Sequence, residues 1–263
     1  MNMKKRKTLV VGNWKMHLNA SQSSLLLARL HNHIAGHRDV EVVIAPGMLS
    51  LQPLSLQIDH RRFRLAAQNA NAKDEGALTG EVSFSMLRNL AHYAIIGHSE
   101  RRIYFNESLQ DVRDKVAASV RNGIMPILCV GETAEERYAG ETKQVLHDQV
   151  TSALSNLTSE EVQQVVIAYE PVWAISNFGG KLAKPIDVKT SLDFIRRQIL
   201  ELYGKTPAEE IRILYGGSVD EHIVGGYLEI ENCDGVLVGS ASLNYRKFSA
   251  IVDAAYRNNK KEK

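Results

Sequence analysis

Three polar side chains, Lys15, His98 and Glu170, each follow a short apolar run of the kind that forms a buried strand. A positioned carboxylate can take a proton from carbon, an imidazole can hydrogen-bond to a nearby oxygen, and an ammonium group can stabilise an oxyanion. Singly, each residue has a structural interpretation, because strand-end lysines and glutamates are commonly solvated and a lone histidine is usually structural. If the strands belong to one barrel, their ends meet at one mouth, and the three residues indicate a single catalytic site.

Two glycine-rich segments follow further strand-like runs, at 215–218 (YGGS) and 238–243 (VGSASL). Their plain interpretation is a pair of tight turns. Glycines also let backbone N–H groups approach an anion, and a helix N-terminus beyond the second segment adds the positive end of its dipole. We therefore predict a phosphate cup formed by Ser218, Gly239 and Ser240, which specifies a phosphorylated ligand but no reaction.

The elements that must position these residues alternate along the chain. Strand-like runs lie at 8–11, 40–45, 63–67, 93–96, 125–130, 165–169, 212–215 and 235–238. Between them, apolar residues recur at steps of three and four, as in Leu26, Leu30 and Ile34, which predicts helices that cover parallel strands. The pattern predicts a single α/β domain over 1–263, a closed (β/α)8 barrel of eight parallel strands surrounded by helices, with 1–7 as a flexible basic N-terminus. An open doubly wound sheet is disfavoured because no GxGxxG motif follows the first strand.

Composition narrows the class of protein. Of the 263 residues, 44% are hydrophobic and 24% are charged, which is typical of a folded globular chain. The net charge is only +2 and no long basic stripe or membrane-length apolar stretch is present, so we expect neither nucleic acid nor a membrane as partner. Cys129 and Cys233 lie in apolar contexts typical of buried thiols, which fits a reducing cytoplasm. No ligand spacing suggests a metal, and no cofactor is expected.

Four segments together resemble the motif set of the triosephosphate isomerases: GNWK at 12–15, GHSERR at 97–102, YEPVWAI at 169–175 and YGGSV at 215–219. Their order and spacing match as well. The resemblance implies a TIM barrel that interconverts dihydroxyacetone phosphate and D-glyceraldehyde 3-phosphate through an enediolate, without a cofactor. It further implies a place in glycolysis and gluconeogenesis.

The resemblance gives the acid–base roles to Glu170 and His98. Glu170 would carry the proton between adjacent carbons, because a carboxylate is ionised at neutral pH and can act as the base. His98 would hydrogen-bond the developing enediolate as a neutral imidazole, and a helix starting near Ser99 disfavours the protonated ring through its dipole.

The remaining site residues would bind and support. By resemblance Lys15 supplies positive charge to the oxyanion and the phosphate, and Asn13 holds that geometry. Ser99 could cap the helix that follows His98. Glu100 has two interpretations: it orients Lys15, or it is simply an acid at a helix start.

Residues 68–81 form a long stretch without helical or strand period, which a compact barrel would not normally leave unsupported. The resemblance implies a homodimer in which this loop enters the neighbouring subunit, with Thr79 approaching Asn13. Leu78 replaces the aromatic residue usual in the family, so we expect a somewhat weaker interface.

Two departures from the family's pattern concern the phosphate. Ser240 stands at the second glycine of the usual VGGASL, so its side chain either points away from the phosphate or hydrogen-bonds to it. After Ile175 the lid segment is two residues longer than usual. We expect an N–H of Ser176 or Gly180 to reach the phosphate and Phe178 to help exclude water; alternatively, the extra residues are a surface bulge.

Two other functions stay open at this stage. Another phosphate-binding barrel isomerase or aldolase would need a different set of residues, such as a Schiff-base lysine in the sixth strand, where this chain is apolar up to Glu170. A barrel retained only for binding or surface adhesion would usually have lost a catalytic side chain.

Overall fold

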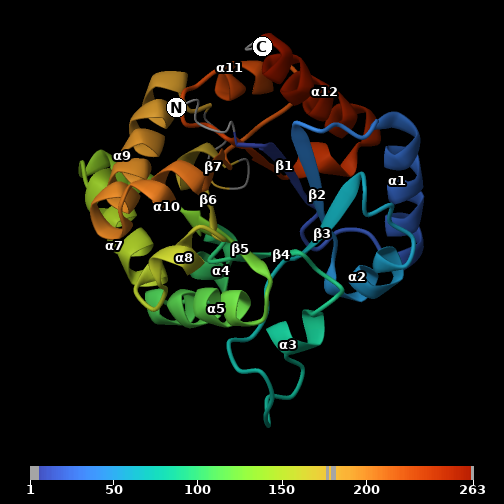
Figure 1. Ribbon diagram of the computed structural model, residues 1–263, viewed down its shortest axis with the longest axis horizontal. Helices are drawn as coiled ribbons and strands as arrows, with labels where there is room; N and C mark the ends of the chain where they lie inside the picture. Colours follow the sequence, from blue (N-terminus) through green and yellow to red (C-terminus); the bar gives the residue numbers. More distant parts are fainter. Residues whose placement is uncertain (1–5, 176–177, 179–181, 262–263) are drawn as a thin grey trace.

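The structure is a computed structural model that describes residues 6–175, 178 and 182–261. Its strands form a closed barrel in which each strand pairs in parallel with the next and β8 pairs with β1 (Figure 1). The strands are β1 (Thr8–Asn13), β2 (Val40–Ala45), β3 (Phe63–Ala67), β4 (Tyr93–Ile96), β5 (Met125–Val130), β6 (Val166–Tyr169), β7 (Arg212–Tyr215) and β8 (Gly235–Val238). The predicted fold class is confirmed. Strand bounds agree with the prediction except that β1 extends to Asn13 and β6 starts at Val166.

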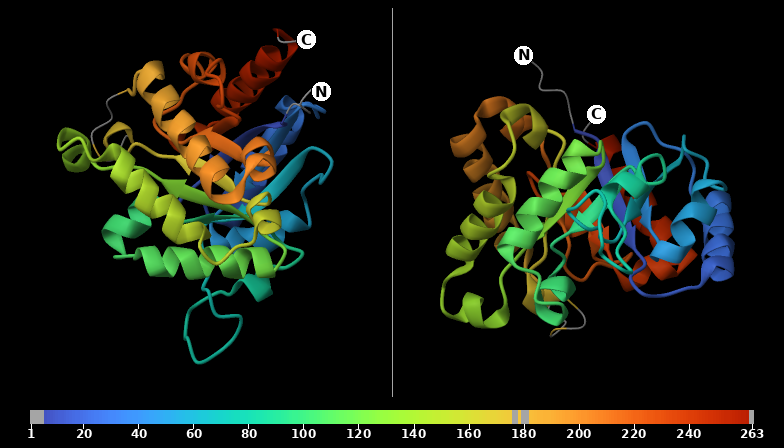
Figure 2. Two further views of the ribbon diagram at one scale, coloured as in Figure 1. Left: turned by 60° about the vertical axis from the view of Figure 1, so that its left-hand side comes forward. Right: turned by 90° about the horizontal axis from the view of Figure 1, so that it is seen from below.

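Helices surround the barrel and connect its strands (Figures 1 and 2). They are α1 (Ala20–His33), α2 (Met48–Ser55), α3 (Phe84–Leu87), α4 (Ser99–Tyr104), α5 (Leu109–Arg121), α6 (Ala134–Tyr138), α7 (Thr142–Leu154), α8 (Ser159–Val162), α9 (Pro185–Tyr203), α10 (Lys205–Glu210), α11 (Val224–Leu228) and α12 (Tyr245–Lys261), with 3-10 turns η1 (Val172–Ala174) and η2 (Ser240–Leu243). Several begin with side-chain caps, as at Ser108, whose hydroxyl accepts from the N–H of Asp111 at 3.1 Å.

The apolar core has two layers because successive strand residues point to opposite faces of the sheet. Leu9 and Val11 of β1 belong to the cluster inside the barrel, and Val10 between them belongs to the cluster that packs under the helices. Leu26, Leu30 and Ile34 are buried in that outer cluster, as their spacing predicts. With both faces of each strand buried, the strand ends are fixed in position and can hold side chains precisely at the mouth.

The stretch between β3 and α3 projects away from the barrel as a long loop (Figures 1 and 2). Its base is held by the chain itself: Asn71 donates to Glu81 at 2.9 Å, and Arg121 of α5 pairs with Asp74 at 3.1 Å. Thr79, near the tip, is exposed. Side-chain contacts therefore support the base of the loop, and backbone hydrogen bonds from Leu78 to Gly76 and from Glu81 to Leu78 shape its outer part.

The basic N-terminal run is tied to the barrel at Arg6. The Arg6 guanidinium pairs with Asp234 at 2.7 Å and also donates to the carbonyl of Glu209. This differs from the solvated terminus expected for Arg6, because the Asp234 carboxylate just before β8 offers a partner that the sequence does not reveal. Residues 1–5 lie outside the described residues.

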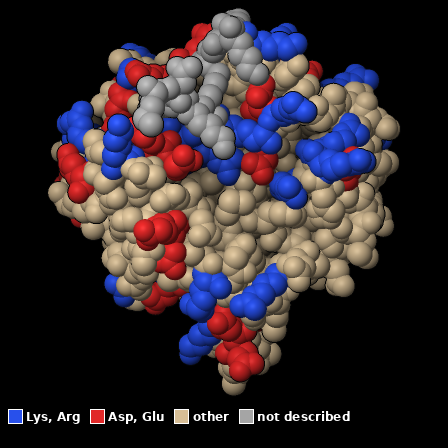
Figure 3. Space-filling model, in the orientation of Figure 1, with Lys and Arg blue, Asp and Glu red and all other residues tan. Residues whose placement is uncertain are grey.

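The two cysteines are free thiols, as predicted. Burial raises the pKa of Cys233 to about 12 and the pKa of Cys129 well above its usual value. On the face shown in Figure 3, charges of both signs are interspersed. Among the described residues no helix is long and apolar enough to cross a membrane.

Candidate active site

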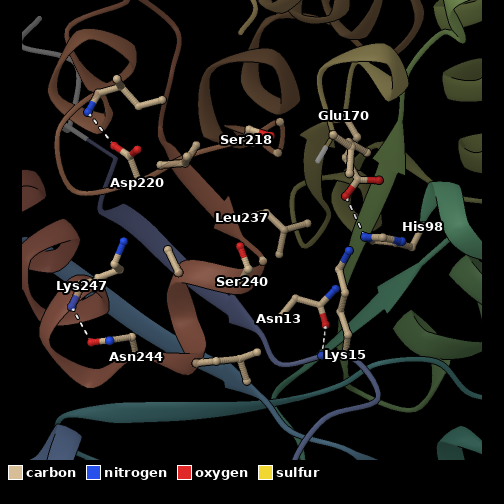
Figure 4. Close-up of a pocket in the computed structure, with 18 of the residues that line it drawn as sticks. Asn13, Lys15, His98, Glu170, Ser218, Asp220, Leu237, Ser240, Asn244 and Lys247 are labelled. Carbon is tan, nitrogen blue, oxygen red and sulfur yellow. Dashed lines mark hydrogen bonds and ion pairs between the residues drawn. The ribbon is translucent and has the colours of Figure 1, made fainter. Parts of the chain in front are cut away.

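A cavity of about 520 Å³ opens at the carboxyl ends of the strands (Figure 4). It brings together side chains from loops that follow different strands: Asn13, Lys15, His98, Glu170, Ser218, Gly239 and Ser240 line it. The residues selected from the sequence as catalytic thus share one cavity with those selected for the phosphate cup.

Lys15 has a left-handed backbone, with φ at 52°, which is uncommon for a residue with a side chain. Two contacts hold it there: its N–H donates to Asn13 Oδ1 at 3.0 Å, and Gln68 Nε2 donates to its carbonyl at 2.8 Å. Gln68 also donates to the carbonyl of Ala45, which fixes the amide between the ends of β1 and β2. The Lys15 ammonium then reaches Glu100 Oε1 at 2.6 Å. Both interpretations of Glu100 fit the structure, because it contacts Lys15 and is also the acidic residue in the first turn of α4.

His98 is the N-cap of α4: its Nδ1 accepts from the N–H of Glu100 at 3.3 Å. The expectation that Ser99 caps this helix is wrong, because Ser99 is already its first helical residue. An Nδ1 that accepts leaves the hydrogen of a neutral ring on Nε2. That Nε2 lies 3.2 Å from Glu170 Oε1, so the ring is fixed between the helix start and the carboxylate.

Glu170 directly follows β6 and is almost fully buried. Its Oε2 accepts from the N–H of Ser99 at 3.3 Å, while Oε1 faces His98. A side chain at Gly216 would place Cβ 2.8 Å from Glu170 Cγ, so glycine is required beside the carboxylate. The Cys129 thiol behind it has its pKa raised by burial and by the Glu170 charge. The carboxylate therefore sits in a tight niche that opens to the cavity.

The glycine-rich segments form another part of the cavity wall, where Figure 4 labels Ser218 and Ser240. Both the N–H and the hydroxyl of Ser218 donate to the carbonyl of Ala174, at 3.1 and 2.7 Å. Ser242 donates to the carbonyl of Gly239 at 2.6 Å and thereby holds the turn into η2. Ser240 begins η2, is exposed, and directs its hydroxyl into the cavity.

A buried carboxylate behind η1 anchors the segment that leaves β6. Glu132, fully buried, accepts from Trp173 Nε1 at 2.9 Å and from the hydroxyl of Tyr169. The Arg137 guanidinium lies 4.3 Å from the centre of the Trp173 ring and pairs with Asp187 of α9 at 2.9 Å. Arg137 therefore contacts residues on both sides of the stretch between η1 and α9.

Ser99 and Glu100, which the sequence suggested as supporting residues, do not line this cavity themselves. Ser176 and Gly180 lie outside the described residues. Thr79 is exposed near the tip of the projecting loop, and within this chain it does not line the cavity.

Gln68, Glu132 and Arg137 have structural roles here that the sequence alone did not indicate. Glu132 comes two residues after β5, and its place at a strand end is a signal that could have selected it, because functional residues of barrels follow strand ends. Gln68 likewise follows β3 directly. Arg137 had no such signal, because it lies in α6 and its partners are far away in sequence.

The cavity combines a buried carboxylate, a fixed imidazole and an ammonium group with a glycine-rich wall. This arrangement can move a proton at carbon while it stabilises a negative oxygen and holds an anionic group. Among the described residues no group of three or more His, Cys, Asp and Glu side chains is arranged to hold a metal ion.

Comparison with known proteins gives consistent matches. A family model described as triosephosphate isomerase matches residues 8–255. A protein of Citrifermentans bemidjiense named triosephosphate isomerase is 42% identical over 248 residues, covering 94% of this chain and 98% of that protein. One of Symbiobacterium thermophilum with the same name is 42% identical over 251 residues, covering 95% and 97%. One of Carboxydothermus hydrogenoformans, also so named, is 40% identical over 248 residues, covering 94% and 98%.

Proposed function

Because this chain belongs to the triosephosphate isomerase family and is an isomerase of that class, we propose that Glu170 is the base that interconverts dihydroxyacetone phosphate and D-glyceraldehyde 3-phosphate. The observation that carries the proposal is the placement of the Glu170 carboxylate 3.2 Å from His98 Nε2, in a cavity that Lys15 also lines. A carbon acid beside a carbonyl needs both a base and a group that stabilises the oxygen, and both are present there.

Two side chains balance the reaction, one for the hydrogen on carbon and one for the hydrogen on oxygen. Glu170 takes a proton from C1 of dihydroxyacetone phosphate, the C–H electron pair forms the C1–C2 double bond, and negative charge develops on the C2 oxygen. His98 hydrogen-bonds to the enediolate oxygens through Nε2, gives its Nε2 proton to the C2 oxygen and takes the proton of the C1 hydroxyl in return, so that the negative charge moves to the C1 oxygen. Glu170 then returns the proton to C2, which gives the aldehyde and restores the carboxylate.

Lys15 serves both the reacting oxygen and the phosphate in this proposal. Glu100 fixes the ammonium group at 2.6 Å, and Asn13 fixes the backbone that carries it. Gly239 and Ser240 provide the near wall of the phosphate cup, and a Cβ on Gly239 would lie 3.7 Å from Lys15 Cε. The lysine thus passes directly over the cup, where one charge acts on both ends of a small substrate.

Ser218 joins the cup on binding, we propose, when its donors exchange Ala174 for a phosphate oxygen. For the two lid residues outside the described region, the proposal is that an N–H of Ser176 or Gly180 contacts the phosphate. A Gly180→Val variant should then have a lower kcat/KM, with a loss of transition-state stabilisation of about 1–2 kcal/mol. It should also release more methylglyoxal. Unchanged kinetics and methylglyoxal in both Gly180→Val and Phe178→Ala would favour the surface bulge instead.

The experiment that tests the reaction is a coupled assay of the purified chain with D-glyceraldehyde 3-phosphate, with dihydroxyacetone phosphate detected by its enzymatic reduction. We expect turnover without added metal or cofactor, and turnover retained in the presence of a chelator. A chain that binds the substrate without converting it would contradict the proposal and favour a binding protein. Cleavage or condensation of carbon chains instead of isomerisation would favour an aldolase.

The chain also carries a surface suited to a second copy of itself, and we propose a homodimer. Met16, which is 97% exposed, and Met48 line a second cavity of about 380 Å³, which Asn13 and Lys15 also line. The proposal seats the projecting loop of one subunit, with Thr79 near its tip, in this cavity of its partner. Sedimentation that shows a fully active monomer at micromolar concentration would contradict it.

We further propose that the protein acts in the cytoplasm, in glycolysis and gluconeogenesis. Its two cysteines are free thiols, which suits a reducing compartment.

A further inference from the structure

The projecting loop between β3 and α3 is held at its base through one residue, Asp74. Its Oδ1 accepts from Asn122 Nδ2 at 2.8 Å, and its Oδ2 accepts from the Arg121 guanidinium at 3.1 Å. The hydroxyl of Ser85 donates to the Asp74 carbonyl at 2.7 Å. Arg121 ends α5 and Asn122 is its C-cap, and the loop leaves the barrel beside this helix (Figure 1). The loop is thus attached to the barrel by a clamp of four residues: Asp74, Ser85, Arg121 and Asn122.

The amide of Asn122 is itself fixed. Asn122 is only 7% exposed, its Nδ2 also donates to the carbonyl of Ala118 at 2.8 Å, and its Oδ1 accepts from Arg88 Nε at 2.8 Å. A buried amide with these hydrogen bonds cannot turn away from Asp74 without losing them. The hydrogen bonds from Asn122 and Arg121 lower the pKa of Asp74, so its carboxylate is ionised at neutral pH. The clamp therefore fixes a charged group between the loop and α5.

Beyond the clamp, the outer part of the loop is open to solvent. Residues 75–81 are all exposed, and backbone hydrogen bonds within this stretch shape it. An exposed segment loses conformational entropy when it docks on a partner. A segment that is already held in its docked shape loses less, and the complex is correspondingly tighter. A clamp at the base of the loop therefore affects how tightly the loop can bind.

We propose that Asp74 is a positioning residue of the subunit interface: by clamping the loop to α5 it orders residues 75–81 for entry into the partner subunit and tightens the dimer. The inference rests on the homodimer proposed above, in which this loop enters the partner's cavity. Leu78 buries less apolar surface than the aromatic residue usual in the family, so the loop depends more on being ordered beforehand. Asp74 lines neither of the two cavities at the barrel mouth, so it affects turnover only through assembly.

The test measures the dimer Kd by sedimentation of fluorescently labelled protein over a range of dilutions. Asp74→Ala removes the whole carboxylate and should raise the Kd by about tenfold. Arg121→Ala removes only an exposed ion pair and should raise it by about two- to fivefold. The double variant should match Asp74→Ala, because Arg121 acts on the loop through that carboxylate. At protein concentrations that keep the dimer assembled, kcat should be unchanged in all three variants.

A second measurement reports the order of the loop itself. A glutamate-specific protease should cleave after Glu75 faster in Asp74→Ala than in wild type, when both are diluted to monomers. Asp114→Ala is the matched control, because its side chain is 44% exposed against 43% for Asp74 and its contacts with Arg113 and Gln110 lie within α5. This control should change neither the Kd nor the cleavage rate.

The outcomes separate this inference from the homodimer. A wild-type Kd in Asp74→Ala would overturn the inference and leave the homodimer standing, whereas a wild type that is always monomeric would overturn both. A raised Kd without faster cleavage after Glu75 would also overturn it, because ordering of the loop would not be the cause. So would an equal effect from Asp114→Ala, which would indicate a general loss of stability.

Discussion

The two ends of the barrel both hold charged side chains, but they hold them differently. At the amino-terminal ends of the strands, Arg212 donates to Glu41 at 2.7 Å and to the hydroxyl of Tyr93 at 2.7 Å, and that hydroxyl donates to Glu41 at 3.0 Å. The three groups satisfy one another in a closed triangle. Burial raises the pKa of Tyr93 to about 12, so the phenol stays a donor at physiological pH.

At the carboxyl-terminal ends, the charges face an open cavity instead. Lys15 pairs with Glu100, and Glu170 contacts His98 and one backbone N–H. Lys15, His98 and Glu170 all line the cavity that a ligand can enter. The comparison teaches that a closed charge network at one end contributes stability, whereas an incomplete one at the other end is available for chemistry. A substitution at one end of the barrel should therefore leave the function of the other end intact.

The largest expected effect is from Glu170→Gln, which keeps the shape of the base and removes its charge. Turnover should fall by about 10² to 10⁴, because a positioned general base contributes that much. The melting temperature should stay near that of wild type. Steady-state kinetics and thermal unfolding of the same preparation measure both, and more than a tenth of the wild-type rate would mean that Glu170 is not the base.

Lys15→Met should reduce both binding and rate, since one ammonium group serves the phosphate in the ground state and the oxyanion later. We expect kcat to fall on the order of 10²-fold and KM to rise. Kinetics over a range of substrate concentrations separates the two parameters. A raised KM with an untouched kcat would show that Lys15 only binds.

Glu41→Gln should affect stability instead of turnover, because it removes the carboxylate from the network of Arg212, Glu41 and Tyr93. The Arg212 charge then stays largely buried without its carboxylate partner, so the free energy of unfolding should fall by about 3 kcal/mol. Urea unfolding measures the loss, and kcat per folded molecule should be unchanged. A variant with wild-type stability and impaired turnover would refute the division between the two ends.

The smallest expected effect is a pH dependence from His92, also at the amino-terminal end. Burial lowers the pKa of His92 below 6.5, and the Arg64 guanidinium, 3.0 Å from Nε2, lowers it further. The native state then binds fewer protons than the unfolded chain, so this contribution to stability is complete above about pH 6.5 and is lost as the pH falls through that value. His92→Gln should lose less stability than wild type between about pH 7.5 and 5.5, and an equally steep loss would contradict the assignment.

The fold was predictable because barrel strands are buried on both faces and read as short apolar runs, and the site because its residues follow those runs directly. Lys15, His98 and Glu170 are in one cavity as expected, and the family resemblance is confirmed. Contacts between distant segments were not predictable. The tie from Arg137 to Asp187 and the stacking of Phe178 on Tyr104 depend on where the closed barrel places separate loops, and no local pattern encodes that.

The measurement that tests the central claim most directly follows hydrogen exchange at C1 of dihydroxyacetone phosphate in D2O by proton NMR. A single carboxylate facing one side of the substrate should exchange one of the two C1 hydrogens and leave the other untouched. Glu170→Gln should exchange neither on the same time scale. Exchange of both hydrogens by wild type, or undiminished exchange in the Gln variant, would contradict the account.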